Sequence, residues 1–374
     1  MDKSRSRAPL RALACLVIVS SSFAAVQAEE PDAAHVRRPR YELIDLGLPY
    51  YSVTEGINNK GQIVGSNQAT PNDPQYAFLW KNGHVQYIGA VGGTDSQGVA
   101  VNKQGEVVGS AQNAQQTWIG MVYSGGQSEA LPIEIAYGLN SLGQIVGSSN
   151  VPPPAPHVME STAAQLYQDG IVTNLGSLGG YISAANGIND RGEIVGYSDT
   201  GPDTTSPLHA FLYRDGKMTD LGTFGGQNSD AVAINSHGVI TGAADLPPTS
   251  TTTPEHAFIY RSGRMIDLGV VGSDVSSSGS AINEFDEVVG FTSTGTNTTS
   301  GAMFAMVYTH GKMYHLQDLV DPSSRALASH VNLYEATGIN NDGWIAVNGY
   351  DTNDRTPPNQ FFGLPRSYLM RPVR

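Results

Sequence analysis

Carboxylate, amide and tyrosine side chains interrupt a repeated pattern of small residues that usually reads Ser-x-Ala-x-Gly/Ala-Ile-Asn. The interruptions are Glu55, Gln97, Tyr137, Asn186, Asp230 and Glu335. Nearby segments add the aromatic residues Tyr50, Tyr51, Tyr181, Phe224 and Tyr334. Aromatic rings can stack on the apolar faces of sugars, while amides and carboxylates bind hydroxyl groups. These residue types therefore predict a ligand-binding site made by Tyr51, Glu55, Gln97, Tyr181, Asn186, Asp230, Tyr334 and Glu335.

The same carboxylates also leave a catalytic alternative open. A pair such as Glu55 with Asp230 or Glu335 would suit glycoside chemistry if the two carboxyl groups lay about 5 to 10 Å apart. The chain contains no zinc-protease, nucleophile-elbow, phosphate-loop or dinucleotide motif, so no catalytic residue and no cofactor is assigned. The acidic loop from Asp351 to Asp354 lacks an EF-hand pattern and is predicted to be solvated, so no metal site is assigned.

The elements that must position these residues come from an internal repeat. The motif aliphatic-Asn-x-x-Gly-x-aliphatic-x-Gly recurs with its asparagine at 58, 102, 140, 189, 235 and 283, and in degenerate form at 340. Successive asparagines are separated by 38 to 57 residues. An asparagine amide can bond the backbone of its own turn, and glycine supplies a positive φ. We therefore expect the asparagines to have a structural role.

Each repeat contains four short runs rich in β-branched and aromatic residues. The first strand ends in Ile-Asn and the second begins at Gly-x-Ile-Val-Gly. A third run such as Ala210–Tyr213 follows, and then a fourth segment such as Asp220–Gly222 or Asp318-Leu319. We call these four strands A, B, C and D. Four strands in 40 to 50 residues are typical of a propeller blade. A parallel β-helix is the structural alternative, but its coils are usually shorter.

The two ends of the repeat region predict ring closure. Residues 41–46 resemble a strand D that lacks its own A, B and C, and residues 367–370 resemble a strand C without a following D. Together they complete one blade and remove exposed sheet edges. The sequence thus predicts an all-β fold, with residues 41–374 forming one seven-bladed β-propeller of four-stranded antiparallel blades.

The beginning of the chain predicts export. Residues 1–28 contain a basic start, an apolar run too short to span a bilayer and the small residues Val26 and Ala28 before the expected cleavage site. Residues 29–40 are expected to form a flexible linker. Cys15 is the only cysteine, so its removal excludes disulfides and thiolate chemistry. We predict a secreted protein, periplasmic or extracellular, with no membrane insertion after cleavage.

The charge of the chain bears on its partners. The full chain has 21 basic and 34 acidic residues, and without residues 1–28 the balance is 17 against 33. An acidic surface without a basic stripe repels phosphate backbones, so nucleic acid is not an expected partner. A monomer is expected, and its partner is predicted to be an extracellular glycan or protein.

Several repeats resemble a known family. His209–Tyr213, His256–Tyr260 and the run from Asp220 to Ser229 are similar to the secreted bacterial proteins with HAF-type (His-Ala-Phe) extracellular repeats. The similarity extends over nearly the whole chain after residue 28, although the second, third and seventh repeats depart from the histidine-centred version and have Gly120, Ala164 and Tyr368 in that run. The resemblance implies a secreted repeat protein and assigns no catalytic residue. We expect His209 and His256 to have packing or turn roles, because equivalent positions in adjacent blades are too far apart to share a metal.

The turns then indicate where a ligand could bind. The A–B and C–D turns are short and lie on one face of the predicted ring, whereas the B–C and D–A loops are long and variable and lie on the other. Loops that a rigid frame positions commonly carry function. The sequence favours a non-catalytic binding module that uses the long-loop face near the axis. The alternatives are a polysaccharide hydrolase or lyase with acid and base residues at the hub, and a protein of purely structural use at the cell surface.

Overall fold

The computed structural model describes residues 38–49, 51–70, 72–152, 161–203, 205–249, 253–295, 301–353 and 364–373. Residues 39–374 form one compact unit. The predicted signal peptide, and residues 29–37 of the predicted linker, lie outside the described residues.

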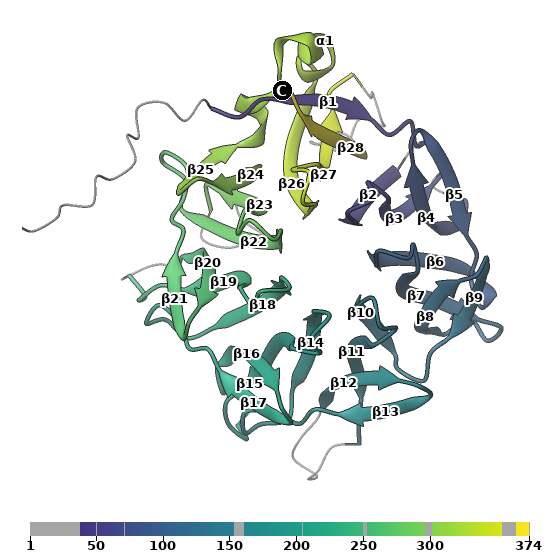
Figure 1. Cartoon of the computed structure of the whole chain (residues 1–374), viewed down its shortest axis with the longest axis vertical. Coiled ribbons are helices and arrows are strands. Elements are labelled where there is room, and N and C mark those ends of the chain that lie inside the picture. Colours follow the sequence, from purple (N-terminus) through teal and green to yellow (C-terminus); the bar gives the residue numbers. More distant parts are fainter. Residues whose placement is uncertain are drawn as a thin grey trace, which may run out of the picture. The chain divides into compact units, whose positions relative to one another are not determined.

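Seven four-stranded antiparallel sheets stand around a central axis, so the predicted all-β, seven-bladed propeller is confirmed (Figure 1). Blade 1 contains β2 (Tyr51–Ile57), β3 (Ile63–Gln68), β4 (Gln75–Lys81) and β5 (His84–Ile88). Blade 2 contains β6 (Gly92–Val101), β7 (Val107–Asn113), β8 (Trp118–Ser124) and β9 (Gln127–Ala130). Blade 3 contains β10 (Ile135–Leu139), β11 (Ile145–Asn150), β12 (Thr162–Gln168) and β13 (Ile171–Asn174).

The remaining blades follow the same order from the axis outward. Blade 4 contains β14 (Ser183–Ile188), β15 (Ile194–Asp199), β16 (Leu208–Arg214) and β17 (Lys217–Asp220). Blade 5 contains β18 (Ser229–Ile234), β19 (Ile240–Asp245), β20 (Glu255–Arg261) and β21 (Arg264–Asp267). Blade 6 contains β22 (Ser276–Ile282), β23 (Val288–Ser293), β24 (Met303–Thr309) and β25 (Lys312–His315). Blade 7 contains β26 (Val331–Ile339), β27 (Ile345–Asp351), β28 (Pro365–Pro372) and β1 (Tyr41–Asp45).

The ring closes in blade 7, where the first strand of the described chain pairs with the last. β1 is antiparallel to β28, with Tyr41 opposite Pro372 and Asp45 opposite Tyr368. Tyr41 and Leu43 are buried in the core of this blade. Arg371 of β28 binds Glu42 of β1 at 2.6 Å. The predicted closure by the N-terminal and C-terminal strands is therefore confirmed.

Apolar side chains from neighbouring blades form the cores. Between blades 4 and 5, for example, Val195 and Ala210 pack with Ala231, Ile240 and Phe258. Because strand residues point alternately to the two faces of a sheet, each middle strand supplies apolar residues to both neighbouring interfaces. Strands such as β23, in which every residue is buried, occur because both faces of the sheet are covered by neighbouring blades.

The strand-B glycine is required by a bulge in strand A. In blade 5 the register shifts between Ala231 and Ala233, which leaves Val232 as the extra residue. A Cβ added to Gly242 would lie 1.9 Å from the carbonyl oxygen of Asp230, so no other residue fits without movement. Every blade has a bulge of this kind near the end of strand A, and in blades 1 to 6 a glycine lies opposite it. In blade 7 Val347 stands in this place opposite Ala336, where β26 has a second register shift.

The repeated His-Ala-Phe and Asp-Leu-Gly segments are joined by polar contacts. His209 Nδ1 lies 2.8 Å from Asp220 on the adjacent strand, and the amide of Gly222 donates to the same carboxylate at 2.7 Å. His256 and Asp267 repeat this arrangement in blade 5. The histidines of these segments thus pair with aspartates on the adjacent strand, and the aspartates also accept an amide of their own turn.

A repeated serine joins each of several blades to the one before it. Ser229 Oγ of blade 5 donates to the carbonyl of Gly222 at 2.6 Å and accepts the amide of Ala210 in blade 4 at 2.9 Å. Ser183 and Ser277 make the equivalent contacts at two other interfaces. The serine of the repeat thus bridges two backbone groups of the preceding blade.

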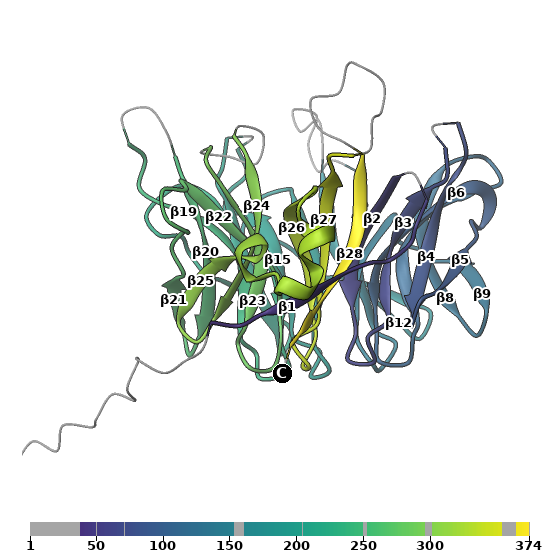
Figure 2. The same ribbon diagram turned by 90° about the horizontal axis from the view of Figure 1, so that it is seen from above.

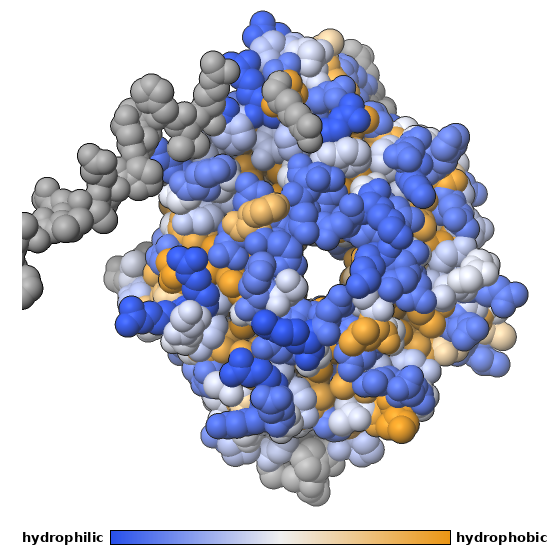
Figure 3. All heavy atoms as spheres, viewed as in Figure 1, coloured by the Kyte–Doolittle hydropathy of each residue, from blue (hydrophilic) through white to orange (hydrophobic). Residues whose placement is uncertain are grey.

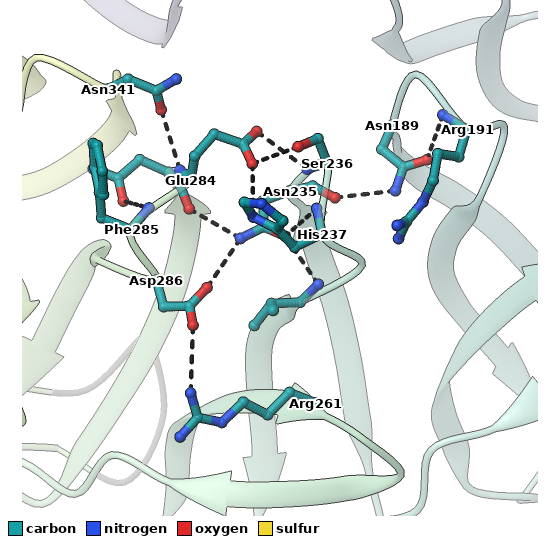
Figure 4. Close-up of polar contacts among 12 residues, drawn as sticks. Asn189, Arg191, Asn235, Ser236, His237, Arg261, Glu284, Phe285, Asp286 and Asn341 are labelled. Atoms are coloured by element: carbon teal, nitrogen blue, oxygen red, sulfur yellow. Dashed lines mark hydrogen bonds and ion pairs between the residues drawn. The ribbon is translucent and has the colours of Figure 1, made fainter.

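The seven motif asparagines form a closed ring of hydrogen bonds. Each Nδ2 donates to the backbone carbonyl of the asparagine in the next blade, at distances of 2.8 to 3.2 Å. Asn340 of blade 7 donates to the carbonyl of Asn58 in blade 1, which closes the ring. Each Oδ1 accepts two amides of its own turn, as Asn235 does from His237 and Val239. Figure 4 shows part of this ring, with Asn189 bonded to Asn235. All seven are buried, so the expected structural role is confirmed.

One segment departs from the repeat. After β25 the chain forms two short 3₁₀ turns, Leu316–Leu319 and Pro322–Ser324, and the short helix α1, Arg325–Ala328. The sequence pattern placed Asp318 and Leu319 at the end of a strand D, which is wrong because this strand ends at His315. Leu316 and Leu319 instead enter the blade 7 core, which explains the apolar spacing that resembled a strand.

Candidate functional site

The inner strands surround a central cavity of about 640 Å³. Figure 3 shows the opening at the centre of the ring, which is surrounded mainly by hydrophilic residues. Figure 2 shows the blades edge-on, with the short turns on one side of the ring and the long loops on the other. The cavity lining includes four of the eight predicted site residues, which are Glu55, Asn186, Asp230 and Glu335.

The polar residues of the cavity stand at two levels that the strand-A bulge defines. The bulged residue itself makes the inner level, which comprises Glu55, Val99, Tyr137, Asn186, Val232, Ser280 and Thr337. The residue two positions earlier makes the outer level, nearer the long loops, which comprises Val53, Gln97, Ile135, Ala184, Asp230, Ser278 and Glu335. We call these the inner and outer variable levels.

Two carboxyl groups and three tyrosines meet where blade 7 joins blade 1. Glu55 comes from β2 and Glu335 from β26, and both line the cavity. Tyr334 stacks on Tyr350 with ring centroids 4.5 Å apart. Tyr51 lies close enough to both rings to influence their ionisation. We call this group the closure sector, and it brings together the predicted residues Tyr51, Glu55, Tyr334 and Glu335.

The carboxyl groups of the closure sector resist ionisation. Desolvation by the surrounding protein, followed by the charge of Glu335, raises the pKa of Glu55 to about 7. Desolvation also raises the pKa of Glu335. The Glu55 side chain remains accessible from the channel, so its desolvation comes from the walls around it. In the described structure neither carboxyl accepts a hydrogen bond from a protein donor or pairs with a cation.

The opposite side of the cavity carries a different arrangement. Asn186 Nδ2 donates to Asp230 Oδ1 at 2.9 Å and to the carbonyl of Ala231 at 3.0 Å. Burial raises the pKa of Asp230 to about 7; the bond from Asn186 opposes the shift, and Glu255 adds to it. Asp230 also borders a side pocket of about 210 Å³ between blades 4 and 5, whose lining includes Tyr197. This side contains a partnered carboxyl where the closure sector has two without donors.

The remaining predicted residues lie away from the cavity. Gln97 occupies the outer level, but its Nε2 donates to Gln75 Oε1 at 2.9 Å. Tyr181 lies in the loop between β13 and β14, where its amide donates to Asp199 at 2.7 Å. Phe224 packs against the core between blades 4 and 5, and Tyr50 lies outside the described residues. Neither Gln97 nor Tyr181 is among the residues that line the central cavity.

Sequence reasoning did not select the hydroxyl-bearing residues of the cavity. Ser278, Ser280 and Thr337 line it, as does Phe291 of β23. A count back from each ring asparagine would have found the first three, because the inner and outer levels lie three and five residues before it. The same count places Glu55 at the inner variable level and Glu335 at the outer variable level. Phe291 has no such signal, since it lies on strand B.

The cavity has a one-sided charge. Among the described residues that line it, none is lysine, arginine or histidine, whereas Glu55, Asp230 and Glu335 are acidic. Within the described part of the chain, no group of three or more histidine, cysteine, aspartate or glutamate residues is placed to hold a metal ion. The loop predicted to be solvated has Asp351 bonded to His330 at 2.9 Å, and Asp354 lies outside the described residues.

Comparison with known proteins identifies the fold. No protein-family model and no curated protein matches the sequence, so the resemblance to the HAF-type repeat proteins stays a prediction. The structure is similar to acylaminoacyl peptidase of Pyrococcus horikoshii, with a TM-score of 0.52 and 10% identity over 88% of this chain. The match covers 54% of the peptidase, so this chain spans about half the length of that protein.

A second similar structure is the propeller domain of the trilobed protease of Pyrococcus furiosus, with a TM-score of 0.51 and 11% identity. The match covers 86% of this chain and 94% of that domain, which is described as having an open velcro topology. In the present chain β1 and β28 pair instead. These similarities support the propeller fold alone. Within the described residues, no helix is long and apolar enough to cross a membrane.

Proposed function

We propose that this chain is a secreted, non-catalytic binding protein that holds an extracellular glycan at the long-loop end of its central cavity. The observation that carries this proposal is the closure sector, where two carboxyl groups line a cavity of about 640 Å³ and a stacked tyrosine pair lies close enough to Glu335 to be influenced by its charge. Tyrosine rings and carboxyl oxygens suit the apolar faces and hydroxyl groups of a sugar. The predicted signal peptide and the HAF-type resemblance support export.

A secreted polysaccharide hydrolase or lyase is the second candidate, because two carboxyl groups with raised pKa share the closure sector. Acid–base catalysis usually needs environments that push the two pKa values apart, so that one group is protonated and the other ionised. Here desolvation raises both, and no described donor favours ionisation of either. Among the described residues no donor holds one of the two carboxyl groups ionised while the other stays protonated, and this favours binding over turnover.

A glycan array followed by product analysis tests the proposal. We expect the protein without residues 1–28 to retain at least one glycan and to release no oligosaccharide from it on long incubation. Filling the cavity with Thr337→Trp should abolish retention, whereas Leu142→Ser, at an exposed turn on the opposite face, should not. Released products that disappear in Glu335→Gln would establish the enzyme instead. Binding of protein ligands but no glycan would overturn the ligand class.

A further inference from the structure

We propose that the closure sector selects a glycan that carries a free, positively charged amino group, such as an oligosaccharide of glucosamine. This inference rests on the proposed function and specifies its ligand. An ammonium group would stand between the carboxyl groups of Glu55 and Glu335, against the rings of Tyr334 and Tyr350. Three independent observations support this inference.

The first part is the unmet hydrogen-bonding capacity of the two carboxyl groups. Glu55 and Glu335 project from adjacent blades into one cavity and receive no hydrogen bond from the described protein. On the opposite side, Asp230 has a donor in Asn186 at 2.9 Å. Burial raises the pKa of both groups and so favours their protonated form without a ligand. A cationic donor would stabilise the ionised form, which only accepts hydrogen bonds. The closure sector can therefore accept hydrogen bonds that the protein does not supply.

The second part is the position of the tyrosines. Tyr334 and Tyr350 stack at 4.5 Å, and Tyr334 is the extra residue of a second register shift in β26, between Leu333 and Glu335. This shift places an aromatic ring directly before a cavity carboxyl. Aromatic faces attract ammonium groups by about 0.5 to 2 kcal/mol, depending on how far the cation is desolvated. Rings and carboxylates together favour an amine over a hydroxyl.

The third part is the charge around the cavity. None of its described lining residues is basic, and the chain has a formal net charge of −13. Field lines concentrate in a concave site with walls of low dielectric, so the cavity attracts cations and repels anions. Uronic acid polymers and phosphorylated glycans are thus disfavoured. A neutral sugar would gain nothing from this field.

Two oligosaccharides of equal length that differ only in acetylation make a direct test. Tetramers of glucosamine and of N-acetylglucosamine are titrated calorimetrically into the whole protein without residues 1–28, at about pH 6.5. We expect the amine form to bind at least about tenfold more tightly, and this preference should shrink as salt is added. Equal affinities, or tighter binding of the acetylated form, would overturn the proposed charge selection while leaving a glycan-binding function intact.

Matched variants locate the preference. Glu335→Gln should weaken binding of the amine tetramer about tenfold and change binding of the acetylated tetramer less than about twofold. Asp230→Asn removes a carboxyl from the other side of the same cavity and should preserve the preference. Tyr334→Leu should weaken the amine form about threefold. Thermal unfolding of each variant confirms folding. If Glu335→Gln keeps the preference, the assignment to this sector is wrong; if neither tetramer binds and the array is blank, the proposed function fails as well.

Discussion

At the short-turn end of the central channel, all seven blades present an asparagine. Its side-chain amide donates a hydrogen bond to the next blade, and its side-chain oxygen accepts hydrogen bonds from its own turn. Five residues earlier on the same strands, at the outer variable level, the seven blades present valine, glutamine, isoleucine, alanine, aspartate, serine and glutamate. One end of each inner strand thus repeats a bonding pattern, and the other end varies. The repeated end explains how the ring is held together, while the variable end is where a ligand can be recognised.

The largest effect is expected at the asparagine ring. Asn283→Ala removes the acceptor for the amides of Phe285 and Glu287 and the donor to the carbonyl of Asn340. The bond to Asn340 is buried and the other two are part-buried. A buried group left unpaired costs about 1 to 3 kcal/mol, so we expect a total loss of roughly 3 kcal/mol in the free energy of unfolding. Urea denaturation measures it. A loss below about 1 kcal/mol would mean that the ring contributes little to stability.

Removing a carboxyl charge at the variable levels should increase the free energy of unfolding, whereas Asn283→Ala decreases it. The folded protein binds the Glu55 proton more tightly than the unfolded chain, because the pKa of Glu55 rises from 4.5 to about 7. The free energy of unfolding should therefore fall as pH rises from about 4.5 to 7 and change little from this group above that range. Glu55→Gln should reduce this slope and stabilise the protein by roughly 1 kcal/mol at pH 8, a value discounted for the solvent in the open channel.

Asp230→Asn is the control for the pH effect, since the pKa of Asp230 is also raised to about 7. Asp230→Asn should reduce the dependence of the free energy of unfolding on pH, over a pH range that begins lower, near the ordinary aspartate pKa of 3.8. Chemical denaturation at several pH values measures both variants. A wild-type slope that both variants retain in full would contradict the assignment of the titration to these carboxyl groups.

The smallest effect is expected at Ser280, which lies in β22 at the inner variable level, three residues before Asn283. Ser280→Ala should change the free energy of unfolding by less than about 0.5 kcal/mol, because surface substitutions outside special features rarely do more. The ratio of the Asn283 and Ser280 effects is a direct measure of the difference between the two ends of the strand. Similar losses at both positions would remove the distinction.

Much of this organisation could be predicted because it repeats. The spacing of the ring asparagines and the orphan strands at 41–46 and 367–370 sufficed for the blade number and the closure. The segment Leu316–Ala328 could not be predicted, because Leu319 is apolar at a spacing that suits a strand as well as a 3₁₀ turn. Tertiary packing into blade 7 decided between them.

The candidate site was predicted less completely. The residue types of Glu55, Asp230 and Glu335 indicated the cavity, but the convergence of Glu55 with Glu335 depends on two blades that are adjacent only after closure. Gln97 was also selected by type, yet a neighbouring glutamine on β4 satisfies its amide. Composition cannot distinguish a side chain that a neighbour uses from one that is left for a ligand.

Closure has a further consequence for how the protein is made. Among the described strands β1 leaves the ribosome first and its partner β28 last, so the ring cannot close until the strands of all seven blades have been synthesised. Strand pairings between distant segments form slowly, because a long loop must be ordered first. Tyr51 and Glu55 come from an early blade, whereas Tyr334 and Glu335 come from the final one. The closure sector is therefore among the last parts of the propeller to form. If it holds a ligand as proposed, ligand retention should report that folding has finished.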